Sequence, residues 1–395
     1  MMNKDEVRQH LTNDLIPFWC ALKDQEHGGF YGYMDEEGVI DKEAEKGCIL
    51  NSRILWFFSN AAMVLQDRSL IDYAGHAFRI LRDHAWDNER GGVYWSMTYD
   101  GRPADETKHT YNQAFAIYGL ASYYDASGNR EAFQMAMELF HIIEEKCLGE
   151  RGYKEAFTRA FEEASNEKLS ENGVMAYHTM NTLLHVMEAY TELYRVMCKR
   201  NEPGSEQVRE RLLWILAVFK KDIFDAEKGR QKVFFDREMN SLIDLYSYGH
   251  DIETSWLLDR TLEVLGDQEL LNEYGKMTAR MATEICAYAF DGHSLANECE
   301  NGVVDEKRIW WVQAETVLGF LNAYEKSGDE KYRDAANAVW EFIKSYVITA
   351  RKPAEWHSEV NRDGSPRAGH PLVDPWKCPY HNGRMCIEIL SQKVE

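Results

Sequence analysis

A turn followed by an amphipathic helix recurs along the chain: QDRSLIDYAGHAFRIL at residues 66–81, GNREAFQMAMELFHII at 128–143, GDQELLNEYGKMTARM at 266–281 and GDEKYRDAANAVWEFI at 328–343. The first and last gaps between starting points are 62 residues, and the middle gap is 138, slightly more than two periods. GSEQVRERLLWILAVF at 204–219 therefore fits as a further copy. A fixed period of this length is typical of repeat architectures. The second residue of each copy is expected to cap the helix, at Asp67, Asn129, Asp267 and Asp329.

A second helical stretch precedes each turn, so the repeating unit is a helix, a tight turn and a second helix. These preceding stretches lie at 46–65, 111–127, 179–197, 255–266 and 311–328. About six such units fill the 395 residues. Short aromatic segments between units have the composition of extended chain and predict small β-hairpins or loops, at 28–38, 91–101, 232–236 and 356–360.

Polar or aromatic clusters near the start of the first helix of each unit favour a closed ring over an open solenoid. The clusters are Arg53, Tyr111, Asn181 with His185, His250 with Glu253, Trp310 and Trp311 with Glu315, and His381. Because they recur at a similar level along their helices, they would meet at one cavity inside a ring, whereas a solenoid would spread them along a groove. We therefore predict an all-α (α/α)6 barrel with short β-hairpins in the connecting loops, formed as a single domain over residues 1–395.

The charge balance argues against several functions. The chain has 45 Lys and Arg against 66 Asp and Glu, a formal net charge of −21, which disfavours binding to nucleic acid or to anionic membranes. No run of 18 apolar residues is present, and the N-terminus lacks the apolar stretch of a secretory signal. The eight cysteines are scattered without a C-x-x-C pair, as expected for reduced thiols. We expect a cytoplasmic protein that is a monomer rather than a dimer.

His250 and Glu253 form the first candidate catalytic pair. They are three residues apart, so on a helix they share a face, and the carboxylate would orient the imidazole and raise its basicity. The alternative is a buried structural histidine satisfied by a neighbouring Glu. A metal site is disfavoured, because no second histidine lies at a ligand spacing such as H-E-x-x-H.

Three further polar residues each have a functional and a structural interpretation. His381 lies in PWKCPYHNGRM, whose prolines and glycine indicate a shaped entry to the last helix, and it either faces a cavity or caps the helix. His185 shares a helix face with Asn181 and is either a cavity residue or a satisfied core histidine. Arg53 lies in the apolar stretch LNSRILWFF, where it serves as an oxyanion donor or joins a structural ion pair.

The aromatic content points to a carbohydrate ligand. The chain has 11 Trp and 21 Tyr, and aromatic faces stack on sugar C–H surfaces while acids and amides bind hydroxyl groups. Any single Trp, such as Trp310 or Trp311, also fits a role in core packing. GGFYG and GGVYW match neither G-x-G-x-x-G nor a P-loop, so no nucleotide site is predicted.

With these motifs identified, the sequence resembles the N-acylglucosamine 2-epimerase superfamily, and most closely its cellobiose 2-epimerases. The resemblance covers essentially the whole chain and includes GGFYGY (28–33), SRILWFFS (52–59), KHTYNQAFAIY (108–118), MNTLLHVMEAYTELY (180–194), SYGHDIETSWL (247–257), WWVQAE (310–315) and PWKCPYHNGRM (375–385). The fold of the superfamily is an (α/α)6 barrel, in agreement with the repeat. SYGHD and KCPYHNGRM resemble the branch that acts on disaccharides more than the branch that acts on N-acyl sugars.

The resemblance implies reversible epimerisation at C2 of the reducing-end glucose of β-1,4-linked disaccharides, from cellobiose to glucosyl-mannose and from lactose to epilactose, with no cofactor and no metal. By analogy, His250 and His381 are the acid–base residues, both titrating near neutral pH. Arg53 and His185 would stabilise the enediolate oxygens, and Glu253 would orient His250. The substrate-binding residues would be Tyr111, Asn181 and Glu315 on sugar hydroxyls and Trp311 and Trp376 on sugar rings, with Trp310 as packing or a second platform.

Other functions fit parts of the pattern. An aldose–ketose isomerase shares the enediolate and differs in whether the proton goes to C1 or C2, and an N-acylglucosamine or other mono-sugar 2-epimerase belongs to the same superfamily. A glycoside hydrolase or lyase can use this barrel, but hydrolysis needs two opposed carboxylates, whereas these clusters are led by histidines. A helical-repeat scaffold would present an extended concave surface. Substrate contacts from residues 159–169 are left open.

Overall fold

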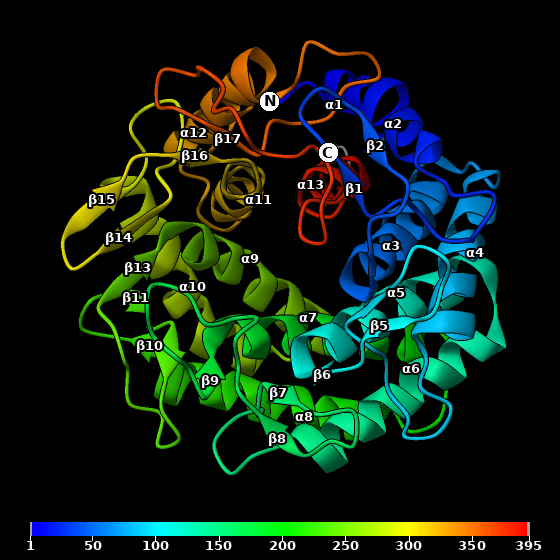
Figure 1. Ribbon diagram of the computed structural model, residues 1–395. Coiled ribbons are helices and arrows are strands. Elements are labelled where there is room, and N and C mark those ends of the chain that lie inside the picture. The colour runs from blue at the N-terminus through cyan, green and yellow to red at the C-terminus, as the bar shows by residue number, and fades with distance from the viewer. Residues whose placement is uncertain (1, 393–395) are drawn as a thin grey trace.

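Within residues 2–392, which the computed structural model describes, six helices form the inner layer of a ring (Figure 1). They are α3 (Cys48–Leu65), α5 (Thr110–Ser127), α7 (Met180–Arg200), α9 (Tyr248–Leu265), α11 (Trp310–Ser327) and α13 (His381–Ser391). Each inner helix contacts the next along the chain, and α13 contacts α3, so the layer closes on itself. The predicted (α/α)6 barrel is confirmed, and the closed ring rules out the open solenoid.

Outer helices pack against the inner helix that precedes them: α4 (Leu70–Ile80), α6 (Arg130–Ile142), α8 (Ser205–Val218), α10 (Gln268–Tyr288) and α12 (Glu330–Phe342). The sixth outer position belongs to α1 (Lys4–His10), which contacts α13 and is followed by α2 (Ile16–Ala21). Both ends of the chain therefore build the last helix pair. Single π-helical turns follow five of the outer helices among the described residues, at Leu11–Leu15, Leu81–Ala85, Ile143–Cys147, Phe219–Ile223 and Ile343–Val347.

The turns of the repeat behave largely as predicted. Asn129, Asp267 and Asp329 accept hydrogen bonds from first-turn backbone N–H groups of α6, α10 and α12, and residues 204–219 supply α8. The expectation for Asp67 was wrong, because residues 67–70 first form a tighter turn in which Leu70 N bonds to Asp67 O at 3.3 Å. The helix begins only at Leu70, and the Asp67 carboxylate accepts from Ser69 N instead, at 2.9 Å.

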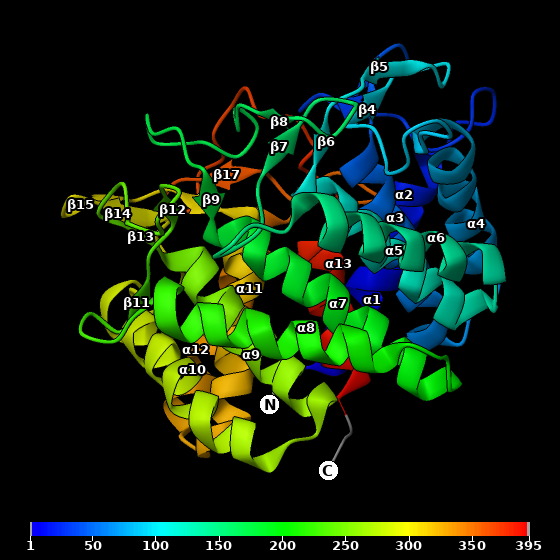
Figure 2. The ribbon, with the colours of Figure 1, turned by 90° about the horizontal axis from the view of Figure 1, so that it is seen from below.

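Short strands gather at one end of the ring, while both termini lie at the other end (Figure 2). The strands are β1 (Tyr33–Met34), β2 (Ile40–Asp41), β3 (Lys46–Gly47), β4 (Ser96–Met97), β5 (Pro103–Asp105), β6 (Lys108–His109), β7 (Ala156–Phe157), β8 (Glu163–Ala164), β9 (His178–Thr179), β10 (Phe224–Asp225), β11 (Arg230–Gln231), β12 (Phe234–Phe235), β13 (Leu245–Ser247), β14 (Glu298–Glu300), β15 (Val303–Asp305), β16 (Arg308–Ile309) and β17 (Glu359–Val360). Each of the inner helices α3 to α11 starts directly after a strand, so their first turns all lie at the strand end.

The strand that precedes an inner helix pairs with a strand that follows the outer helix of the same pair. The antiparallel pairs are β3–β4, β6–β7, β9–β12, β13–β14 and β16–β17. The predicted hairpins at 28–38 and 91–101 are confirmed by β1–β2 and β4–β5. The segments at 232–236 and 356–360 contain β12 and β17, which pair with the distant strands β9 and β16. Phe235 and Val360 also form local antiparallel bridges, to Ser241 and Pro366.

Buried ion pairs fix several of these strands to the turn beneath them. Lys46 Nζ donates to Asp24 Oδ2 at 2.6 Å and to Gly28 O at 2.7 Å, and both charged side chains are fully buried. Lys108 with Asp87, Arg308 with Asp291 and Lys377 with Glu355 repeat the arrangement in other units. A buried charge needs a partner, so each pair holds the start of an inner helix in one position.

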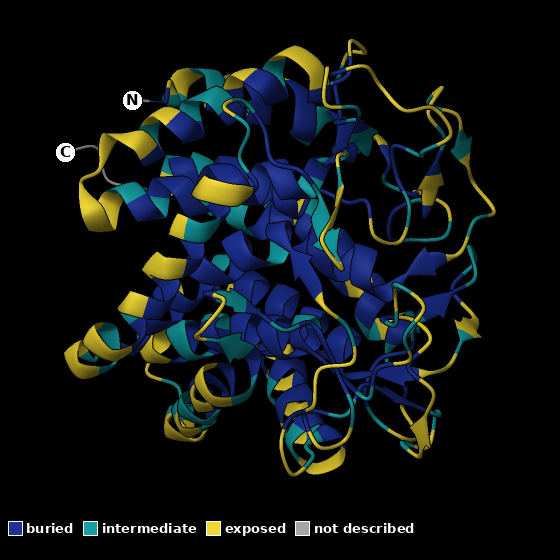
Figure 3. Ribbon diagram, turned by 90° about the vertical axis from the view of Figure 1, so that its left-hand side faces the viewer, coloured by how far each residue is buried: buried dark blue, intermediate teal, exposed yellow. Residues whose placement is uncertain are grey.

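Burial follows the two layers. Figure 3 shows buried residues throughout the inner helices and exposed residues on the outer helices and connecting loops. The inner helix α3 is long and apolar enough, by length and composition, to cross a membrane, and it is the one such helix among the described residues. Its apolar sequence has a sufficient explanation in the fold, because 78% of that window is buried against other parts of the ring.

We predict that Lys46→Ala lowers the free energy of unfolding by about 3–5 kcal/mol, because it leaves the Asp24 carboxylate buried without its partner. Denaturant unfolding monitored by circular dichroism measures this loss. Lys344→Ala is the matched control, since its pair with Glu6 is partly exposed and should contribute at most about 1 kcal/mol. Equal losses in the two variants would contradict the role given to the buried pair.

Candidate active site

A cavity of about 470 Å³ opens at the strand end of the ring, among the first turns of the inner helices. Ten of the eleven predicted site residues line it: Arg53, Tyr111, Asn181, His185, His250, Glu253, Trp310, Trp311, Trp376 and His381. Glu315 does not line the cavity and instead lies behind His381. The sequence clusters therefore meet in one place, as the ring interpretation required.

Each of the three histidines has a partner at Nδ1. His381 Nδ1 lies 2.7 Å from Glu315 Oε1, and His185 Nδ1 lies 2.9 Å from Glu188 Oε2. His250 Nδ1 lies 2.7 Å from the hydroxyl of Ser247, the residue that precedes α9. The partner at Nδ1 fixes the ring orientation and leaves Nε2 as the nitrogen for chemistry.

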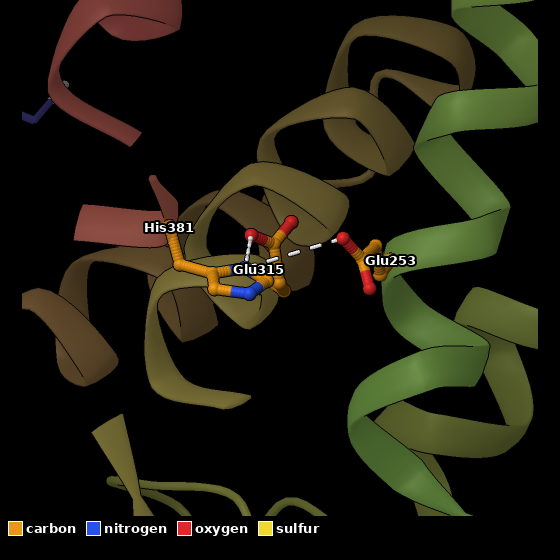
Figure 4. Close-up of side chains that lie close together, drawn as sticks. All are labelled: Glu253, Glu315 and His381. Atoms are coloured by element: carbon orange, nitrogen blue, oxygen red, sulfur yellow. Dashed lines mark hydrogen bonds and ion pairs between the residues drawn. The ribbon is translucent and has the colours of Figure 1, made fainter. Parts of the chain in front are cut away.

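The predicted pairing of Glu253 with His250 was wrong. Glu253 Oε1 accepts a hydrogen bond from Arg384 Nη2 at 2.5 Å and lies 4.0 Å from His381 Nδ1 (Figure 4). His250 bonds backwards to the residue before its helix, whereas Glu253 lies almost one turn further along and shares Arg384 Nη2 with Glu315. A spacing of three residues allows a contact but does not choose between competing partners.

Glu315 also differs from its predicted role. Its Oε1 accepts from Arg384 Nη2 at 2.7 Å, and its Oε2 accepts from Trp256 Nε1 at 3.0 Å. With His381 also on Oε1, the carboxylate is occupied by protein groups. Glu315 therefore holds His381, and a direct bond from Glu315 to a sugar hydroxyl has no support.

Arg384 is the main site residue that the sequence analysis missed. Its guanidinium, fully buried, donates to Glu188 and Tyr380 through Nη1 and to Glu253 and Glu315 through Nη2. A sequence signal for it existed, since Arg384 follows His381 by three residues within the quoted HNGRM motif. The same spacing relates Glu188 to His185.

Burial dominates the electrostatics of the histidines. It lowers the pKa of His250 to about 3 and lowers the pKa of His185. Burial, with Arg384 and Arg53 nearby, also lowers the pKa of His381 well below its ordinary value. Burial therefore argues against the expectation that His250 and His381 titrate near neutral pH. All three imidazoles are neutral at pH 7, the form that can accept a proton.

The three carboxylates on Arg384 differ in charge state. Burial works to raise the pKa of Glu188, but Arg384 and His185 lower it to about 2. Burial and the neighbouring Glu315 raise the pKa of Glu253 to about 8, and burial raises that of Glu315. Because two neighbouring carboxylates cannot both be charged at a buried position, Glu253 and Glu315 share one proton near neutral pH. Glu253 Oε2 has no partner among residues 2–392, so it is the free position for that proton.

Glu253, Glu315 and His381 offer ligand atoms within 4.8 Å of one another, a grouping that resembles a metal site (Figure 4). One Arg384 nitrogen, Nη2, bonds to both carboxylates. The guanidinium thus supplies the positive charge that a cation would bring. The absence of a metal and of a cofactor stays a prediction.

Arg53 faces the cavity without a counterion. None of the described residues forms an ion pair with it, and it contacts neutral groups: it donates to Tyr111 Oη at 2.9 Å and stacks on Phe115 at 4.1 Å. The structural ion pair is therefore excluded for Arg53. Its uncompensated charge is suited to an oxyanion in the cavity.

The aromatic residues divide into cavity and packing positions. The Trp311 ring lies 4.8 Å from that of His250 and 5.4 Å from that of His381, so one indole contacts both imidazoles. Trp376 is 39% exposed at the cavity mouth and is free to stack on a ligand. Trp310 is buried beneath Lys377, which favours the packing role.

Residues of the connecting loops and short strands complete the lining of the cavity, and no periodic pattern in the sequence indicated them. They include Lys168, Leu169, Glu171, Asn297, Glu298, Glu359, His370 and Asp374. Lys168 and Leu169 belong to the segment 159–169, whose contacts were left open. Asn181 Oδ1 has no partner among the described residues and also faces this space, so it is available to a hydroxyl group.

Comparison with known proteins identifies the family. A family model described as N-acylglucosamine 2-epimerase (GlcNAc 2-epimerase) matches residues 29–382. This chain belongs to the N-acylglucosamine 2-epimerase family. The cellobiose 2-epimerase of Eubacterium cellulosolvens is 48% identical over 404 residues, covering 100% of both chains. The cellobiose 2-epimerase of Ruminococcus albus is 49% identical over 390 residues, covering 99% of both.

A solved structure agrees with the family assignment. The crystal structure of a sugar epimerase from a ruminal bacterium has a TM-score of 0.96 to this chain at 48% identity, with 100% of each chain covered. The family resemblance drawn from the motifs is thus confirmed over the whole length. The match to the family model, over residues 29–382, includes the positions of His250 and His381.

We predict that the His250 imidazole stays neutral until the pH falls towards about 3, because protonation would place a charge in a buried position. NMR of the protein labelled with ¹⁵N-histidine follows this titration, and His250→Gln assigns the signal. An unperturbed histidine titrates near 6.5. A midpoint close to that value would show that the cavity solvates His250 and that the electrostatic description is incorrect.

Proposed function

We propose that this protein is a cellobiose 2-epimerase that reversibly inverts C2 of the reducing-end glucose in β-1,4-linked disaccharides, such as cellobiose and lactose. One observation carries the proposal: neutral His250 and His381 line the same cavity and both contact the indole of Trp311. Arg53, which has no counterion among the described residues, lines the same cavity. The cellobiose 2-epimerases that resemble this chain over their full length support the substrate class. The cavity volume of about 470 Å³ is in the range of small-molecule sites.

The chemistry assigns a task to each group. The sugar ring must first open, because C2–H becomes acidic only beside the free aldehyde. A neutral histidine accepts the proton of the C1 hydroxyl group and returns it to the ring oxygen as the bond between C1 and that oxygen breaks. A neutral imidazole then removes the C2 proton and leaves an enediolate. Arg53 stabilises the enediolate oxygens. Neutral His185 donates its Nδ1 proton to Glu188, so it presents Nε2 to the substrate as an acceptor and not as the second donor expected from the sequence.

Inversion requires the proton to return on the opposite face of C2. His250 on α9 and His381 on α13 come from different inner helices and both contact Trp311, which suits a pair of bases at opposite faces. Glu315 orients His381, and Ser247 orients His250. Tyr111 and Asn181 bind hydroxyl groups, and Trp311 and Trp376 stack on sugar rings.

Related activities differ in a measurable product. An aldose–ketose isomerase would return the proton to C1 and form a ketose, and a mono-sugar or N-acylglucosamine 2-epimerase would prefer a single ring. Hydrolysis is disfavoured, because Glu253 and Glu315 both bind Arg384 and do not oppose each other across the cavity.

The remaining expectations are part of the same proposal. Residues 1–395 form one domain, of which residue 1 and residues 393–395 lie outside the described part. The chain acts as a monomer, since one chain supplies all the inner helices that line the cavity. A cytoplasmic location fits the eight cysteines, all of which are free. The partner is a small-molecule sugar, with no nucleic acid, membrane or cofactor.

Incubation of cellobiose with the protein in D₂O, followed by NMR, tests the activity. We expect glucosyl-mannose with deuterium at C2, because the returning proton comes from a group that exchanges with solvent. A ketose product would identify an isomerase, and released glucose would identify a hydrolase. Unchanged cellobiose without deuterium would reject the proposed activity.

We predict that His250→Asn and His381→Asn each lower kcat by at least about 10³-fold, because each removes one acid–base group. Initial rates of epimer formation measure the loss. His141→Asn, at an exposed position on α6, is the control and should retain the wild-type rate. Substantial activity in either cavity variant would remove that histidine from the mechanism.

A further inference from the structure

Arg384 joins three buried carboxylates that come from three different inner helices. Glu188 lies on α7, Glu253 on α9 and Glu315 on α11, while Arg384 itself lies on α13. All four side chains are at most 5% exposed. Arg384 does not line the sugar cavity, so it acts through its neighbours.

Two of these carboxylates hold a histidine of the cavity. Glu188 bonds to Arg384 through Oε1 and to His185 through Oε2, and Glu315 bonds to Arg384 and His381 through Oε1. A single carboxylate therefore links the guanidinium to each of the two imidazoles. Because a carboxylate at Nδ1 sets the orientation and tautomer of a histidine, whatever fixes the carboxylate fixes the ring.

We propose that Arg384 is a positioning residue that holds His185 and His381 together in the geometry of the reaction, through Glu188 and Glu315. The inference rests on the proposed epimerase function for its kinetic readout. It adds a residue outside the sugar cavity to the machinery, and it links two histidines that lie on separate helices.

The shape of the side chain explains why arginine stands here. A guanidinium presents several N–H groups in a rigid plane, so Nη1 serves Glu188 while Nη2 serves Glu253 and Glu315. A lysine has the same charge on a single nitrogen and cannot span these directions. Arg384→Lys thus separates the geometric role from the charge.

The charge itself acts on His381. The charged and titratable groups that face His381 or its immediate surroundings are Glu315 on α11, Glu253 on α9, Arg53 on α3, His185 and Glu188 on α7, and Arg384 on its own helix. Arg384 lowers the pKa of His381, whereas Glu188 raises it. Removing the arginine charge should therefore raise that pKa, and removing the Glu188 charge should lower it.

Kinetics of Arg384→Lys test the geometric role. We expect kcat to fall by about 10²-fold, the effect of displacing a reacting group by about 1 Å, while KM changes by less than about threefold. Arg195→Lys is the matched control, because Arg195 also bonds to two carboxylates, Asp125 and Glu192, but lies near the end of α7 that is remote from the cavity-lining Asn181 and His185. It should lose stability but keep kcat. A wild-type kcat in Arg384→Lys would overturn the proposal.

NMR titration of His381 in Arg384→Gln and Glu188→Gln tests the electrostatic link without any need for activity. The proposal predicts opposite shifts, upward in the first variant and downward in the second. If the wild type fails to epimerise cellobiose but these shifts appear, the electrostatic link between Arg384, Glu188 and His381 stands and the proposed function fails. An unmoved His381 in folded Glu188→Gln would overturn the link, even if Arg384→Gln does not fold. Near-ultraviolet circular dichroism establishes folding in each case.

Discussion

The structure of the site depends on one buried guanidinium and the three carboxylates around it. Arg384, Glu188, Glu253 and Glu315 reach one another only because the ring is closed, since they come from α7, α9, α11 and α13. Closure in turn requires α13 to pack between α11 and α3 and against the N-terminal α1. The chain ends therefore contribute to the site, although no residue of α1 lines it.

This arrangement explains how proton transfer at carbon can proceed in a neutral cavity. The histidines are kept uncharged by burial, and the positive charge that an enediolate needs is concentrated on Arg53, which has no counterion among the described residues. Arg384 has a different task, because its positive charge is compensated by the carboxylates of Glu188, Glu253 and Glu315. The two buried arginines thus have separate roles: Arg53 stabilises the enediolate, and Arg384 positions the bases.

The sequence was sufficient for the architecture because the fold is periodic. The 62-residue spacing and the polar clusters at one level of each first helix predicted the ring and brought ten of eleven residues to one cavity. The partner of His250 was not predictable in the same way. Ser247 lies outside the helix, and the spacing of residues along a helix does not show which of several possible partners a side chain will bind. The role of Glu315 depended on Arg384, whose importance appears only when distant helices meet.

The most direct test of this account is the tautomer of His185 and His381 in the substrate-free protein, measured by ¹⁵N NMR near neutral pH. Because each Nδ1 faces a carboxylate that is held by Arg384, the account predicts that both rings carry their proton on Nδ1 and leave Nε2 unprotonated. A proton on Nε2 of either ring would contradict it, because that ring would then have no free nitrogen to accept a proton or a hydrogen bond from the substrate.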